Sequence, residues 1–299
     1  MNKMVDIHAD DYGYSINTSK DILDCIKAGK LDSFSIMPNM YAFEESMDML
    51  YKEIPNLPFL PLISIHINIP EGYFDDDVFP MSWVKLFLSS YSPNRNAVKK
   101  ALEIDLKKQI EKGWLAIKKC IDLAEKNGIE HKQKGMRLDS HIHTHLIPVV
   151  WDSLMSVIKE EKYEVEYIRN PKEPIIPFLK NASLIPSYGL ANIIKNRILM
   201  LYSGKADRFC EKNNVDKMYM WGLAMSGKMD YERIKQIYPE MIRYCKKRNR
   251  RIELLFHPGR ATENEKNSDM DKDYFPNANL SENRSIEKNA VMHINEIVD

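Results

Sequence analysis

The stretch Gly135-Met-Arg-Leu-Asp-Ser-His-Ile-His-Thr-His-Leu-Ile-Pro148 carries three of the eight histidines on alternate residues, directly after a short apolar run. Side chains repeat every two residues in a strand, so an extended backbone here would place His141, His143 and His145 on one face. Imidazole is the commonest metal ligand in proteins and titrates near neutral pH. The pattern therefore predicts metal binding or proton transfer. The alternative is a polar strand end whose histidines are hydrogen-bonded within the protein.

Short apolar runs and helical patterns alternate along the whole chain. The clearest helical pattern covers residues 96–126, where apolar residues recur at steps of three and four and Gly128 follows. Strands are predicted at 4–9, 33–37, 60–67, 136–138, 167–169, 218–223 and 252–256, and further helices at 15–28, 42–51, 151–160, 190–202, 206–212, 231–248 and 286–297. Connections of this length predict parallel strands with crossover helices, hence either an α/β barrel or a doubly wound sheet.

Polar groups follow four of the predicted strands at their C-terminal ends. They are Asp10-Asp11, His66, the histidine cluster and His257. Active sites of β/α barrels assemble at that end of the strands, so the coincidence favours the barrel. A carboxylate with two imidazoles also forms a facial set that leaves positions open for water and substrate. Taken singly, the two aspartates also fit a capped turn, and His66 also fits a core histidine.

Composition excludes several classes of function. The 299 residues, 44% of them hydrophobic, suffice for a single large domain, here residues 1–299. Lys+Arg and Asp+Glu both number 43, so no net charge argues for nucleic acid or an anionic membrane. The four cysteines show no metal or disulfide spacing, and neither a signal peptide nor a membrane span is evident. We expect a cytoplasmic protein. Irregular segments near 73–95 and 171–227 are expected to set substrate specificity, as loops on a barrel face do.

Four motifs together resemble the YdjC-like carbohydrate deacetylases, which include chitooligosaccharide deacetylases. They are Ala9-Asp-Asp-Tyr-Gly13, His66-Ile-Asn-Ile-Pro-Glu-Gly72, Asp139-Ser-His-Ile-His-Thr-His145 and Glu253-Leu-Leu-Phe-His-Pro-Gly259. Their order and spacing agree with the family over most of residues 4–260. The chain departs from it at His8, Tyr12 and Ser64, where the family usually has Asn, Phe and Gly, and residues 171–227 match no family motif. His8 is expected to hydrogen-bond within the barrel.

The resemblance implies a distorted (β/α) barrel, similar to a TIM barrel, and a metal-dependent hydrolase that removes an acetyl group from an N-acetylated amino sugar or oligosaccharide. It implies one divalent metal ion held by Asp11, His66 and His141. Asp10 would take the proton from the attacking water, and His257 would protonate the leaving amine. Candidates for substrate contact are His143, His145, Arg169 and Asn68.

Some alternatives remain open at this point. Mixed nitrogen and oxygen ligation suits Zn, Co or Ni, and Mg is a further candidate. Other readings are a barrel hydrolase of the amidohydrolase or phosphoesterase type, an iron site for oxygen chemistry, and a catalytically silent sugar-binding protein. The sequence leaves the oligomeric state undecided, with a homodimer among the options.

Overall fold

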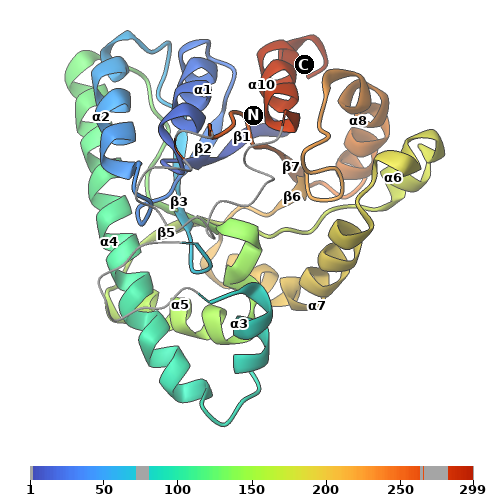
Figure 1. Cartoon of the computed structure of the whole chain (residues 1–299). Coiled ribbons are helices and arrows are strands. Elements are labelled where there is room, and N and C mark those ends of the chain that lie inside the picture. Colours follow the sequence, from blue (N-terminus) through green and yellow to red (C-terminus); the bar gives the residue numbers. More distant parts are fainter. Residues whose placement is uncertain (1–2, 72–80, 263–264, 266–281, 299) are drawn as a thin grey trace.

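A single curled sheet of parallel strands organises the molecule (Figure 1). The computed structural model describes residues 3–71, 81–262, 265 and 282–298. Within these residues the sheet has seven strands in the order β5-β4-β3-β2-β1-β7-β6. The strands are β1 Val5–Tyr12, β2 Ser33–Ile36, β3 Leu62–Ile67, β4 Met136–Ser140, β5 Val165–Ile168, β6 Met218–Trp221 and β7 Arg251–Phe256. Every ladder between neighbours is parallel, which confirms the predicted α/β class.

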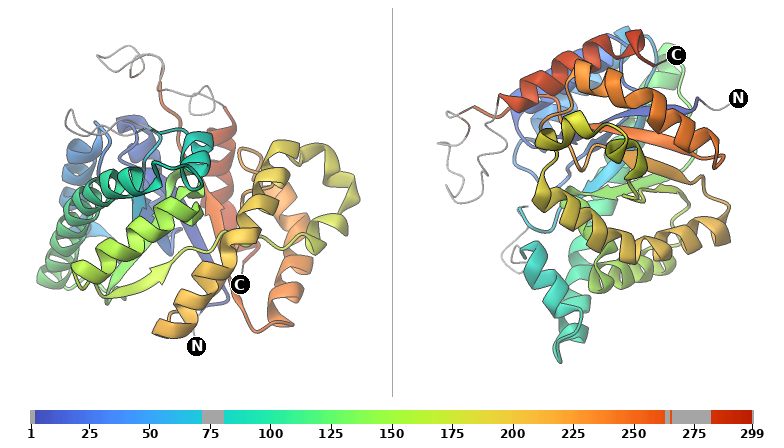
Figure 2. Two further views of the ribbon diagram at one scale, coloured as in Figure 1. Left: turned by 90° about the horizontal axis from the view of Figure 1, so that it is seen from below. Right: turned by 90° about the vertical axis from the view of Figure 1, so that its right-hand side faces the viewer.

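Helices surround the sheet on its outer face (Figures 1 and 2). They are α1 Ile16–Lys27, α2 Phe43–Glu53, α3 Trp83–Ser89, α4 Arg95–Asn127, α5 Pro148–Glu160, α6 Ile176–Leu179, α7 Leu190–Asn213, α8 Tyr231–Lys246 and α10 Asn283–His293, with short 3-10 turns η1 Ile54–Asn56, η2 His141–Leu146, η3 Ala182–Ser187 and η5 Ile294–Glu296. The predicted stripe on α4 buries Leu102, Leu106 and Ile110, and Gly128 ends the helix in the left-handed conformation. None of the described helices combines the length and the apolar composition needed to cross a bilayer.

The sheet is a half-barrel, so the expectation of a barrel is met only in part. Strands β5 and β6 form its two edges, and no ladder joins them among the described residues. The chain that follows β5 bridges this gap instead. Lys172 accepts a backbone hydrogen bond from Met220 in β6 (3.2 Å), and the Glu173 carboxylate accepts the N–H groups of residues 222–224 at 2.8–3.0 Å. A buried side chain therefore replaces the last ladder.

Two other expectations need correction. The histidine stretch is not extended, because the chain turns into η2, and Ile142 and His143 have left-handed φ values of 46° and 59°. The two helices predicted at 190–202 and 206–212 form one helix, α7. In the segment near 73–95, residues 83–89 form α3, and residues 72–80 lie outside the described residues. The segment 171–227 contains α6, η3, α7 and β6.

The concave face of the sheet is lined with polar side chains from several strands. His8 on β1 contacts Ser33 Oγ through Nδ1 (2.6 Å) and Ser35 Oγ through Nε2 (2.9 Å), so it is hydrogen-bonded within the barrel as expected. Tyr167 on β5 donates to Glu253 on β7 across the interior (2.8 Å). These groups are buried and hydrogen-bond to one another, so the interior holds a polar network that leads to the C-terminal ends of the strands.

Candidate metal centre

An irregularity at the end of β1 brings both adjacent aspartates into the polar interior. Neighbouring side chains of a regular strand point to opposite faces. Here the pairing of β1 with β2 shifts register between Ala9 and Tyr12, and Asp11 has φ of +75°. Gly13 follows with φ of +95° and completes the turn. Asp10 and Asp11 are both buried, yet they contact different partners. The sequence places them beyond a strand, whereas the structure includes them in it.

Asp11, His66 and His141 bring three ligand atoms within 4.8 Å of one another. Asp11 Oδ1 lies 3.5 Å from His66 Nε2 and 3.4 Å from His141 Nδ1. This oxygen is buried and has no hydrogen-bond partner among the described residues. A buried carboxylate oxygen is seldom left in that state, and a bound ion would account for it. One carboxylate oxygen and two imidazole nitrogens fit the donor set of Zn, Co or Ni.

Arg284 holds the other oxygen of Asp11. Its Nη1 donates to Asp11 Oδ2 at 2.9 Å from α10, which lies between α1 and α8 (Figure 1). Burial alone would raise the pKa of Asp11, but Arg284 and His141 outweigh burial and lower that pKa below its ordinary value. The carboxylate is therefore ionised and turned so that Oδ1 faces the two imidazoles. Sequence reasoning missed Arg284, since it lies in no motif.

His66 is oriented by a second carboxylate. Its Nδ1 lies 2.7 Å from Asp139 Oδ1, while its Nε2 faces Asp11. A neutral imidazole has one N–H and one lone pair, so the proton shared with Asp139 leaves the lone pair of Nε2 for the metal position. Asp139 belongs to the motif that includes His141, but the sequence alone gave it no role.

Asp10 sits beside this centre in a cage of donors. Arg169 binds it through two hydrogen bonds of 2.8 Å, Ser35 Oγ donates at 2.7 Å, and His8 Nε2 lies 3.0 Å away. Burial opposes ionisation, but Arg169, His66 and His8 together lower the pKa of Asp10 well below its ordinary value. His8, Asp10 and Asp139 form a second group with metal-ligand spacing. There the guanidinium of Arg169, 3.0 Å from Asp139, already supplies the positive charge.

The other two histidines of the cluster, His143 and His145, are not among the residues grouped with metal-ligand spacing. His145 is 1% exposed, and its ring nitrogens contact Ser140 Oγ (2.6 Å) and the Arg169 carbonyl (2.8 Å). Burial, with Arg169 nearby, lowers the pKa of His145 to about 4, so it is neutral and ties η2 to the residue after β5. The geometry offers no support for its predicted contact with substrate. His143 is buried in the left-handed turn of η2.

Two further predicted residues flank the centre. His257 follows β7, its backbone N–H donates to Glu287 on α10 (2.7 Å), and its Nδ1 lies 3.5 Å from the same carboxylate. Its side chain is 21% exposed, and it helps to lower the pKa of Asp11. Asn68 is fully buried and accepts the backbone N–H of Glu71 at 3.3 Å, so it shapes the turn after β3.

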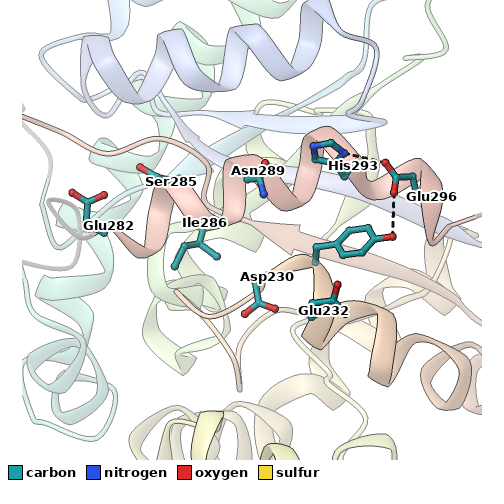
Figure 3. Close-up of a pocket in the computed structure, with 9 residues that line it drawn as sticks. Asp230, Glu232, Glu282, Ser285, Ile286, Asn289, His293 and Glu296 are labelled. Carbon is teal, nitrogen blue, oxygen red and sulfur yellow. Dashed lines mark hydrogen bonds and ion pairs between the residues drawn. The ribbon is translucent and has the colours of Figure 1, made fainter.

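A surface groove of about 640 Å³ lies away from these residues, between α8 and α10 (Figure 3). Its lining includes Asp230, Glu232, His293 and Glu296, and Glu296 accepts hydrogen bonds from Tyr231 and His293. None of the metal-ligand candidates lines it. The candidate centre is therefore the buried cluster and not this surface groove.

Comparisons with known proteins agree with this architecture. A crystal structure from Enterococcus faecalis V583, described as a "putative cellobiose-phosphate cleavage protein", is similar with a TM-score of 0.53 at 15% sequence identity, covering 100% of this chain and 94% of that chain. At that identity the likeness shows the fold alone. No curated protein matches the chain. The family model for YdjC-like proteins matches residues 4–116 and 129–294. The match extends from the strand that carries Asp11 to the helix that carries Arg284, and the chain therefore belongs to the YdjC-like protein family.

Proposed function

We propose that this YdjC-like protein is a metal-dependent hydrolase that releases acetate from an N-acetylated amino sugar or oligosaccharide. The observation that carries the proposal is the unpartnered, buried Asp11 Oδ1 that faces His66 and His141, with a second ionised carboxylate, Asp10, beside it. Such a pair gives one carboxylate to the cation and one to proton transfer. The family is linked to carbohydrates, and the deacetylation step is our inference.

A divalent cation held by Asp11, His66 and His141 would acidify the attacking water and polarise the acetamide carbonyl. Asp10 accepts the proton of that water. Arg169 keeps Asp10 ionised, which is the form that a base requires, and fixes both of its oxygens. The lowered pKa of Asp10 makes this carboxylate a weak base, so Asp10 suits only a water that has been made strongly acidic.

His257 protonates the amine that leaves with the sugar. Its Nδ1 lies near Glu287, which favours a proton there and directs the chemistry to Nε2. Partial exposure suits this role, because a group that meets the substrate cannot be fully enclosed. Glu287 also accepts the N–H of Gly227, so α10 fixes His257 relative to the loop after β6.

The test is acetate release from N-acetylglucosamine and short chitooligosaccharides, with added Zn²⁺, Co²⁺, Ni²⁺ or Mg²⁺ and with chelator. Phosphorylated cellobiose joins the panel because the name of the E. faecalis neighbour refers to it. Asp10→Asn should reduce acetate release about 10²- to 10⁴-fold, the usual contribution of a general base. Asp48→Asn on the exposed face of α2 is the matched control and should leave the rate unchanged.

Acetate release that needs metal and disappears in Asp10→Asn would support the proposal. Cleavage of phosphorylated cellobiose without acetate from any N-acetylated sugar would replace it with another hydrolase activity. Metal binding without any turnover, or sugar binding that persists after metal removal, would refute the deacetylase and favour one of the other readings.

A further inference from the structure

We propose that Glu71 is a positioning residue that orients His141 for the metal, as Asp139 does for His66. The inference rests on the metal centre of the proposed function and adds to it a residue outside the ligand set. In each of the two imidazoles, the nitrogen that faces away from Asp11 then has a carboxylate partner. Ligating histidines commonly donate their second N–H to such a partner, which fixes both the ring and the tautomer.

The geometry at His141 separates its two nitrogens by function. Nδ1 lies 3.4 Å from Asp11 Oδ1, and Nε2 lies 3.4 Å from Glu71 Oε2. At His66 the nitrogens are exchanged, since Nδ1 contacts Asp139 and Nε2 faces Asp11. In both rings one nitrogen faces the orphan oxygen of Asp11 and the other faces a second carboxylate. A proton held at Nε2 of His141 leaves the lone pair of Nδ1 for the metal.

The carboxylate of Glu71 has one unsatisfied oxygen. Its Oε2 is buried and has no hydrogen-bond partner among the described residues, and the side chain is only 18% exposed. The 3.4 Å contact with His141 is longer than a good hydrogen bond. Coordination at Nδ1 polarises the ring and strengthens Nε2–H as a donor, so this contact should shorten in the metal-loaded protein. Tyr14 also stacks with the His141 ring, with centroids 6.4 Å apart and the ring planes at 30°.

A buried hydrogen-bond network holds the turn that carries Glu71. The Asn68 side chain accepts the Glu71 N–H at 3.3 Å. The Gln109 side chain on α4 makes two hydrogen bonds to the backbone of Asn68. It accepts the N–H of Asn68 (2.8 Å) and donates to its carbonyl (2.9 Å). Asn39 donates to the same carbonyl at 2.6 Å. Such anchoring places Glu71 reproducibly and gives Asn68 and Gln109 a role in the metal site that the sequence did not indicate.

The test compares Glu71→Ala and Glu71→Gln with the wild type and with Glu44→Gln, an exposed glutamate on α2 with 75% of its side chain accessible. Metal-free protein is titrated with Co²⁺ against a competing chelator, and the visible spectrum of bound Co²⁺ reports the ligand set. Thermal unfolding of each metal-free variant checks the fold.

We expect Glu71→Ala to weaken Co²⁺ binding about 10- to 100-fold, the usual cost of losing such a partner. Glu71→Gln keeps an oxygen that can accept from Nε2–H and should lose clearly less, and Glu44→Gln should bind as the wild type does. The Co²⁺ spectrum should stay the same in all of them, because His141 remains the ligand.

Equal affinity in Glu71→Ala and the wild type would overturn the inference. So would equal losses in both Glu71 variants with an altered spectrum, since Glu71 would then bind the metal directly. If Asp11→Asn and the wild type bind Co²⁺ equally, or if neither binds it, the metal centre itself fails, and Glu71 loses its role with it. Normal Co²⁺ binding without acetate release would refute only the deacetylase.

Discussion

The hydrogen bonds of Glu173 across the gap between β5 and β6 give a prediction that does not depend on function. The Glu173 carboxylate is 3% exposed and accepts three backbone N–H groups from residues 222–224. Burial outweighs these donors and raises the pKa of Glu173 from 4.5 to about 7. The perturbation is Glu173→Gln, which keeps one oxygen acceptor of similar size and removes the titration.

The magnitude follows from linkage. A folded pKa above the unfolded value means that the folded protein holds the proton more tightly, so the contribution to stability is fully present below about pH 4.5 and is lost as the pH rises to about 7. A shift of this size corresponds to about 3 kcal/mol at 1.36 kcal/mol for each unit, of which roughly 2.5 kcal/mol falls between pH 5 and pH 8. Other groups titrate equally in both proteins and cancel in the difference.

The assay is urea unfolding of the wild type and Glu173→Gln at several pH values from 5 to 8, with the free energies of unfolding subtracted at each pH. The wild type should lose about 2.5 kcal/mol relative to the variant over this range. Carboxyl carbon NMR of Glu173 gives the folded pKa directly and checks the cause. A constant difference, or a titration near the ordinary value of glutamate, would refute the reasoning and show that the three N–H donors outweigh burial.

Three further predictions concern the metal centre and its surroundings. Zn²⁺ or Co²⁺ at 100 times its dissociation constant should stabilise the protein by about 2.7 kcal/mol, and Asp11→Asn should abolish this shift in thermal unfolding. Arg284→Met should lower the stability of the metal-free protein by about 3 kcal/mol in urea unfolding, because Asp11 is left as a buried charge without its partner, and Arg284→Lys should restore part of the loss. His145 has its pKa lowered to about 4 from 6.5, so the stability that it contributes is present above pH 6.5 and lost as the pH falls to 4, by about 3 kcal/mol. His145→Gln should unfold with correspondingly less acid sensitivity, and an identical acid transition in both proteins would contradict the assignment.

Much of the fold can be predicted from the sequence because it depends on local patterns. The buried strands read as short apolar runs, and α4 reads as one stripe of apolar residues, so class and element order follow directly. The bridge across the gap between β5 and β6 is different, since it joins Lys172 and Glu173 to residues about 50 positions later in the chain. No local pattern predicts such a contact. A distorted barrel was therefore predicted in place of the half-barrel.

The candidate site divides in the same way. Motifs name Asp11, His66 and His141, which the structure brings together. The predicted extended conformation of the histidine stretch was wrong, because the alternation of histidines assumes a strand. Ile142 instead adopts a left-handed conformation, which costs energy for a β-branched residue. Only the surrounding packing can impose such a conformation. Arg284 comes from a helix without a motif, and its role depends on where α10 packs.

The contact between Asp11 and Arg284 has a consequence for how the protein folds during its synthesis. The two residues are 273 positions apart, so Asp11 is synthesised long before its counter-ion. Large chains fold in stages while they are being made. A nascent chain therefore carries Asp11 without its arginine until α10 has emerged and docked. The site is therefore complete only once α10 has been made, and a chain that stops before α10 would retain Asp11, His66 and His141 while lacking the arginine that orients Asp11.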